Sequence, residues 1–163
     1  MPDLKKAKNK CYRLLALRPR TEYELGQALK NMNIGQQEIS AIINELKDQK
    51  LVDDEYFAVN WVRWRLSSKP VGKEFLRAEL KYKGIDRKII EKSLSGYNDD
   101  MELEMALLVA RKKARQYDCN TWRKLAGFLA RRGFSNDVIR KVGCLLAGGS
   151  TVDIRAASKS KLT

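Results

Sequence analysis

Three segments of this chain repeat one pattern, and that repetition constrains the fold more than any other feature. In each segment a leucine is followed four residues later by a second leucine, then by a Gly or an Asn, and then by a large apolar residue. The apolar triples are Leu25/Leu29/Ile34, Leu76/Leu80/Ile85 and Leu125/Leu129/Phe134, which recur after 51 and then 49 residues. Such a chain is expected to form a row of similar units rather than one globular core.

Each copy of the pattern predicts a helix, a sharp turn and a second helix. Leucines four residues apart lie on one face of an α-helix. Gly84 and Gly133 suit the left-handed residue that ends a helix, and Asn33 is the next-best choice there. The second helices are predicted over residues 39–46, 89–94 and 138–145.

A further helix is predicted ahead of each pair, over residues 8–17, 55–66 and 101–115. Only three prolines occur, and runs of alternating β-branched residues are missing, which favours helices throughout. The predicted fold class is therefore all-α, an elongated array of three tandem three-helix repeats. The expected divisions are a flexible N-terminus over 1–7, repeats over 8–53, 54–97 and 98–147, and a disordered tail over 148–163.

Positive charge is concentrated in the second and third repeats. The chain has a net charge of +13, but residues 1–55 hold 10 basic and 9 acidic side chains. Residues 56–94 hold 10 basic and 4 acidic side chains, and residues 101–141 hold the same numbers. A field of this kind attracts polyanions such as nucleic acid or an acidic protein surface.

The basic residues of these two repeats are the candidate contacts for a partner. Lys73, Arg77 and Lys81 follow one another at steps of four and form one predicted column beside the leucine stripe. The full candidate set is Arg63, Arg65, Lys69, Lys73, Arg77, Lys81, Lys83, Arg111, Arg115, Arg123, Lys124, Arg131 and Arg132. Most charged runs on helices are solvated faces, so the excess in two consecutive repeats carries the prediction rather than any single residue.

Aromatic side chains offer a second way to hold nucleic acid, by stacking on unpaired bases. The candidates for this role are Trp61, Trp64, Trp122, Tyr82 and Tyr117. Trp61 is expected in the core, because Phe57, Trp61 and Trp64 follow the spacing of one buried helix face.

Catalysis and metal binding find little support in the sequence. The chain has no His, no Cys-x-x-Cys pair and no Gly-rich phosphate loop, so no catalytic residue, metal ligand or cofactor is expected. The acidic run 53–55 could offer oxygens to a divalent cation. A helix N-terminus is the favoured interpretation, since it stabilises negative charge.

The remaining features predict a location in the cytoplasm. Cys11, Cys119 and Cys144 are expected to be buried thiols in a reducing compartment. The N-terminus lacks the apolar stretch of a secretory signal. No apolar run is long enough to span a bilayer, so no membrane partner is expected.

Three stretches of this sequence resemble the motifs of the RecX family. They are residues 17–25 (LRPRTEYEL), residues 51–58 (LVDDEYFA) and residues 69–85 (KPVGKEFLRAELKYKGI). The third repeat is similar to the family's more variable C-terminal part and ends in RRGF at 131–134. The resemblance covers residues 8–147 in the family's order. One departure is Lys50, where members often have a Gly before the LxDD segment.

The resemblance implies a function as well as a fold. RecX-like proteins bind RecA filaments along the helical groove, bind DNA weakly without sequence preference, and suppress the ATPase, strand exchange and coprotease activities of RecA. The resemblance therefore implies a non-catalytic, monomeric regulator of homologous recombination and the SOS response. Two alternatives remain beside it: a stand-alone, sequence-nonspecific DNA-binding protein, and a small hydrolase.

Overall fold

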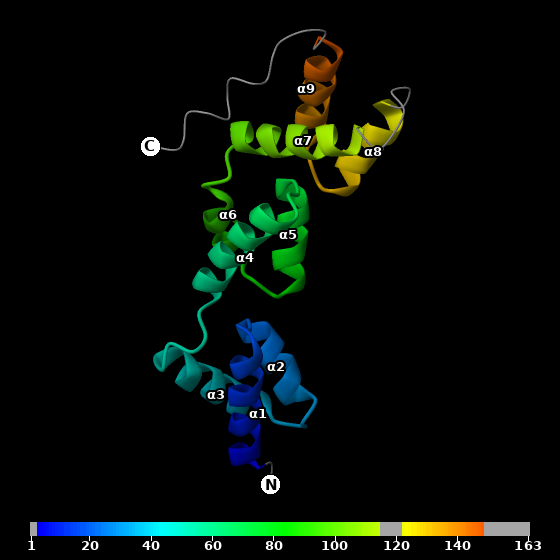
Figure 1. Ribbon diagram of the computed structural model, residues 1–163. Coiled ribbons are helices and arrows are strands. Elements are labelled where there is room, and N and C mark those ends of the chain that lie inside the picture. The colour runs from blue at the N-terminus through cyan, green and yellow to red at the C-terminus, as the bar shows by residue number, and fades with distance from the viewer. Residues whose placement is uncertain (1–2, 115–121, 149–163) are drawn as a thin grey trace.

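The computed structural model describes residues 3–114 and 122–148, and within them it contains helices and no strands. The helices form three groups that follow one another along the molecule (Figure 1). Their bounds are α1 Leu4–Leu17, α2 Glu22–Lys30, α3 Gln36–Asp48, α4 Asp54–Ser68, α5 Lys73–Tyr82, α6 Arg87–Leu94, α7 Asp99–Ala114, α8 Trp122–Arg131 and α9 Asn136–Ala147. The predicted all-α array of three-helix repeats is confirmed.

The first helix begins earlier than the sequence suggests. Asp3 accepts a hydrogen bond from the backbone N–H of Lys6 at 3.1 Å and so caps a helix that starts at Leu4. Part of the segment expected to be flexible, residues 4–7, is therefore helical, and Ala7 is buried in the first core. The segment 149–163, expected to be disordered, lies outside the described residues.

The repeated turns have the predicted left-handed conformation. The backbone φ angle is +57° at Asn33, +76° at Gly84 and +75° at Gly133. In each turn the apolar residue that follows donates its N–H to the carbonyl of the second leucine, at 3.1 to 3.3 Å. Lys50 adopts the same conformation, with φ of +56°, and explains why a Gly suits that position in the family motif.

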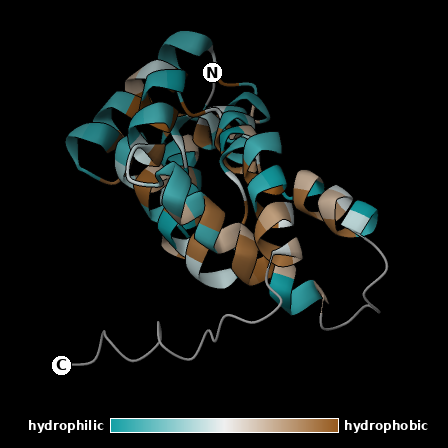
Figure 2. Cartoon of the chain, turned by 90° about the horizontal axis from the view of Figure 1, so that it is seen from above, coloured by the Kyte–Doolittle hydropathy of each residue, from teal (hydrophilic) through white to brown (hydrophobic). Residues whose placement is uncertain are grey.

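Each repeat has its own hydrophobic core. The first is built around Leu25 and Leu29, the second around Leu76 and Leu80, and the third around Leu129 and Phe134. Hydrophobic and hydrophilic residues alternate along the helices (Figure 2). The repeats are thus separate packing units, and other contacts must set how they are joined.

The first junction places the turn of the second repeat on the start of α2. The hydroxyl of Thr21 donates to the carbonyl of Lys83 at 2.7 Å. Gly84 approaches so closely that a Cβ on it would lie 2.2 Å from the Cβ of Tyr23. Only glycine permits this contact, so Gly84 serves both the turn and the junction.

The second junction repeats this arrangement between the third and second repeats. The backbone N–H of Gly72 donates to the carbonyl of Arg132 at 2.8 Å, and the N–H of Glu74 donates to Gly133 at 3.2 Å. A Cβ on Gly133 would lie 2.3 Å from the backbone nitrogen of Phe75. The equivalent turn of the first repeat has Asn33, which carries the Cβ that this mode of docking excludes.

Candidate polyanion-binding surface and the groove of the third repeat

The candidate basic residues divide into two groups in the structure, apart from Arg115, which lies outside the described residues. Seven are exposed and form no ion pair or side-chain hydrogen bond with the described part of the chain: Arg63, Lys69, Lys81, Arg111, Arg123, Lys124 and Arg131. Five are half-buried and have partners within the molecule: Arg65, Lys73, Arg77, Lys83 and Arg132. Only the first group presents unpaired charge to a partner.

Two of the paired cations hold the junctions between repeats. Lys83 forms an ion pair with Glu24 of the first repeat at 3.3 Å, and its ammonium lies over the ring of Trp61 at 4.3 Å. Arg132 donates to the carbonyl of Pro70 at 3.1 Å. These side chains are positioned by the fold and are poorly placed to reach a separate polyanion.

The predicted column of Lys73, Arg77 and Lys81 does not act as one basic stripe. The ammonium of Lys73 lies 2.5 Å from Asp99 and 3.9 Å from the buried carboxylate of Glu102. Arg77 is clamped by Glu91 at 2.8 Å, and also pairs with Glu74. The arginine's hydrogen bond lowers the pKa of Glu91 below its usual value. Of the three, only Lys81 is exposed and unpaired. The spacing along α5 could not predict this, because the carboxylates that neutralise Lys73 and Arg77 lie mainly on α6 and α7.

The tryptophans differ in exposure, although Trp64 follows the same helix-face spacing as Phe57 and Trp61. Trp61 is half-buried, stacks on Phe57 at 5.8 Å and donates its N–H to Glu79 at 3.1 Å. Trp64 is 51% exposed and Trp122 is 44% exposed. Arg65 is bound to Glu79 and lies over the Trp64 ring at 5.3 Å. Trp61 is therefore a structural residue, and the other two rings are accessible.

The acidic run 53–55 is occupied by structural contacts. Asp53 caps α4 by accepting the N–H of Tyr56 at 2.9 Å. Asp54 accepts the N–H of Glu22 at 3.0 Å across the first junction, and burial raises the pKa of its carboxyl. Glu55 pairs with Lys92. These roles agree with the helix N-terminus interpretation.

The expectation of three buried thiols was wrong for one cysteine. Cys11 is buried in the first core, and that burial raises the pKa of its thiol. Cys144 is exposed on α9, because it lies on the face of the helix turned away from the third core. Cys119 falls outside the described residues.

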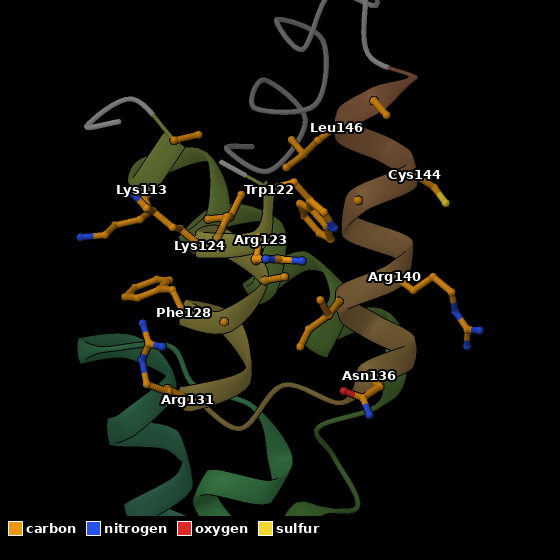
Figure 3. Close-up of a pocket in the computed structure, with 17 residues that line it drawn as sticks. Lys113, Trp122, Arg123, Lys124, Phe128, Arg131, Asn136, Arg140, Cys144 and Leu146 are labelled. Atoms are coloured by element: carbon orange, nitrogen blue, oxygen red, sulfur yellow. The ribbon is translucent and has the colours of Figure 1, made fainter. Parts of the chain in front are cut away.

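A groove between α8 and α9 is a feature that the sequence did not predict. Its volume is about 1210 Å³, and its walls include Trp122, Leu125, Ile139 and Leu146 (Figure 3). A Cβ on Gly143 would lie 2.7 Å from the Trp122 ring, so this glycine allows the ring to lie against α9. In the sequence, only the presence of Trp122 on one helix and Gly143 on the next could have indicated this groove.

The rim of the groove gathers positive charge. Arg123, Lys124 and Arg131 line it from α8, with Lys113 and Arg140 on the neighbouring helices. No acidic residue is among the described residues that line it. Three of the seven unpaired candidates are thus brought together, around an apolar floor rather than on a flat face.

Comparison with known proteins decides the family. Three family models match in succession: the first three-helix domain of RecX over residues 7–46, the second over 53–94 and the third over 99–142. This chain belongs to the RecX family. The matched ranges follow the three groups of helices, so the family's division into domains is also the division of this structure.

Relatives and solved structures agree. The chain is 37% identical to "Regulatory protein RecX" of Mycobacterium sp. (strain KMS) over 136 residues, which covers 78% of this chain and 74% of the relative. It is 31% identical to the Bacillus cytotoxicus protein of the same name, over 85% of this chain and 53% of that one. The crystal structure of RecX from Lactobacillus salivarius superposes with a TM-score of 0.80 at 32% identity, covering 89% of this chain and 97% of that one.

The relatives are named as regulatory proteins, and the family assignment carries that coarse role to this chain. Among the described residues, no helix has the length and apolar character needed to cross a bilayer. The family models describe three successive three-helix domains, and this chain has the same three-part organisation.

Proposed function

We propose that this chain is a non-catalytic regulator that binds RecA nucleoprotein filaments along their helical groove. In this role it lowers the ATPase, strand-exchange and coprotease activities of RecA, and so restrains homologous recombination and the SOS response in the cytoplasm. Membership of the RecX family is the observation that carries the proposal. Weak, sequence-nonspecific DNA binding by a monomer belongs to the same proposal.

The architecture supplies a physical route to such binding. Two docked turns, at Gly84 and Gly133, join the three separate cores into an elongated array. An array of this kind presents several weak contact patches to a polymeric partner at once, and linked weak contacts give tight binding. The unpaired cations of the second and third repeats are the proposed patches.

An ATPase titration tests the proposal. The protein is added to RecA on single-stranded DNA, and ATP hydrolysis is followed at increasing amounts of the protein. Inhibition well below one copy per RecA protomer supports filament binding. Inhibition only when the free DNA is saturated would instead favour a stand-alone DNA-binding protein, which coats the strand and excludes RecA.

Charge reversal locates the contact surface. One triple variant replaces unpaired cations of the second and third repeats by Glu: Arg63, Lys81 and Arg111. A matched control makes the same change in net charge on exposed cations of α1: Lys5, Lys10 and Arg13. We expect the first variant to need about tenfold more protein for half inhibition, and the control to act like the unmodified chain. Equal losses in both variants would reject the assigned surface.

A further inference from the structure

The groove of the third repeat has a smaller counterpart in the second repeat. A shallow hollow of about 210 Å³ is lined by residues of α5, of α6 and of the chain just after α6. Five of the residues that line it match residues that line the groove. Each match is 49 positions apart in the sequence, as Gly84 and Gly133 are. The pairs are Lys73 and Trp122, Arg77 and Ala126, Glu91 and Arg140, Leu94 and Gly143, and Ser95 and Cys144.

Specific side chains fill most of this position in the second repeat. Arg77 and Glu91 form an ion pair at 2.8 Å between α5 and α6. Leu94 is buried there, and Tyr97 is only 2% exposed, with its hydroxyl donating to the carbonyl of Val71 at 3.0 Å. In the third repeat the matching residues of α8 and α9 provide no such ion pair and no such leucine, so the described residues leave the space open.

The first two repeats also show what chemistry covers this position. In the first, the chain after α3 buries Val52 in the core, and the Asp54 carboxylate accepts the N–H of Glu22, the first residue of α2. The cover is therefore an apolar side chain followed by a carboxylate at the start of the middle helix.

The second repeat is covered in the same way. The chain after α6 buries Tyr97, and the carboxylate of Glu102 accepts the N–H of Lys73, the first residue of α5, at 3.0 Å. Glu102 is 2% exposed, so this contact is enclosed. The first and second repeats are thus covered by the same two groups, an apolar side chain and a carboxylate, although the covering segments differ in sequence.

We propose that the groove between α8 and α9 binds an acidic segment of a partner protein. This segment supplies an apolar side chain and a carboxylate to the third repeat. In the first two repeats the chain itself supplies these two groups. The apolar side chain lies against Trp122 and Leu125, and the carboxylate faces the start of α8. Its remaining acidic groups face Arg123, Lys124 and Arg131.

Charge argues for a separate partner rather than the chain's own C-terminal segment. Residues 149–163 contain three cations, Arg155, Lys159 and Lys161, and one acid, Asp153. Their net positive charge has the same sign as the rim of the groove, so this segment is repelled where an acidic one is attracted. A basic rim above an apolar floor is also the arrangement that recognises amphipathic acidic peptides.

A peptide-binding measurement tests the proposal without RecA or DNA, so its outcome is independent of the proposed function. The probe is a dye-labelled peptide that copies residues 51–58 of this chain, LVDDEYFA, the segment that covers the first repeat. Its fluorescence anisotropy is followed as the full chain is added. We expect saturable binding, and about tenfold weaker competition by an unlabelled peptide whose three acids are replaced by Asn and Gln.

Matched variants assign the binding to the groove. Arg123→Glu with Lys124→Glu is expected to weaken peptide binding about tenfold, since both residues line the groove and are exposed. Lys5→Glu with Lys10→Glu makes the same charge change on exposed positions of α1 outside the groove, and is expected to change binding less than twofold. Circular dichroism of both variants checks that helicity is unchanged.

Three results would overturn the proposal. Equal weakening by both charge variants would mean unspecific attraction rather than a groove. A rise in affinity of more than tenfold on removal of residues 149–163 would assign the groove to the chain's own C-terminal segment. Displacement of the peptide by single-stranded oligothymidine at lower concentrations than by unlabelled peptide would assign it to nucleic acid.

Discussion

Replacing Gly133 by Ala should loosen the third repeat from the second. The backbone φ of +75° at this residue disfavours a side chain, which costs about 1 kcal/mol. The new Cβ would also lie 2.3 Å from the backbone nitrogen of Phe75, well inside van der Waals contact. Because backbone cannot move aside as a flexible side chain can, the turn must withdraw from α5.

Withdrawal breaks two hydrogen bonds between backbones. They join Gly72 to Arg132 at 2.8 Å and Glu74 to Gly133 at 3.2 Å. Each contributes about 1 kcal/mol, so the total expected loss is about 3 kcal/mol when the conformational cost is included. The junction accounts for about 2 kcal/mol of this, which corresponds to about a thirtyfold change in its equilibrium.

Asn33→Ala is the matched control, because Asn33 occupies the same position of a turn that docks on no other repeat. Its φ of +57° gives a similar conformational cost of about 1 kcal/mol, without a junction to break. Amide hydrogen exchange is the direct assay. In the Gly133→Ala variant the amides of Gly72 and Glu74 should exchange about thirtyfold faster, and in the control they should keep their protection.

Equal loss of stability in the two variants would refute this reasoning, since the junction would then contribute nothing beyond the turn. Unchanged exchange at Gly72 and Glu74 in the Gly133→Ala variant would do the same. It would mean that the two repeats stay docked despite the added Cβ.

Three further changes test other parts of the structure. Lys50→Gly should raise the midpoint of urea unfolding, by about 0.5 kcal/mol of stability, because φ is +56° there. Glu102→Ala should lower thermal stability by about 2 kcal/mol, because the first N–H of α5 loses its buried acceptor, whereas Glu102→Gln keeps an acceptor oxygen and should lose less. Burial opposes ionisation of Glu24, yet its hydrogen bonds and charge contacts with Arg18 and Lys83 prevail and lower its pKa. The contribution of Glu24 to the free energy of unfolding is therefore complete above pH 4.5, its unperturbed pKa, and is lost as pH falls through the lowered pKa. In the Glu24→Gln variant the free energy of unfolding should depend less on pH across this range.

Much of the candidate site lay beyond the reach of sequence. Helix spacing placed Lys73, Arg77 and Lys81 in one column, but spacing along one helix says nothing of the carboxylates on neighbouring helices. Asp99 and Glu91 lie on α7 and α6, and they neutralise the first two. The groove was missed for the same reason, because an open space is defined by what adjacent helices fail to fill.

Local physics in the sequence determined the helices, their left-handed turns and their threefold repetition, since each depends on residues a few positions apart. Leucine spacing and Gly84 and Gly133 were enough for that. Tertiary structure alone decided that these two glycines also bring the repeats together, and which cations remain free. Both outcomes depend on distances between residues far apart in the chain, where one Cβ or one carboxylate changes the result and no local pattern records it.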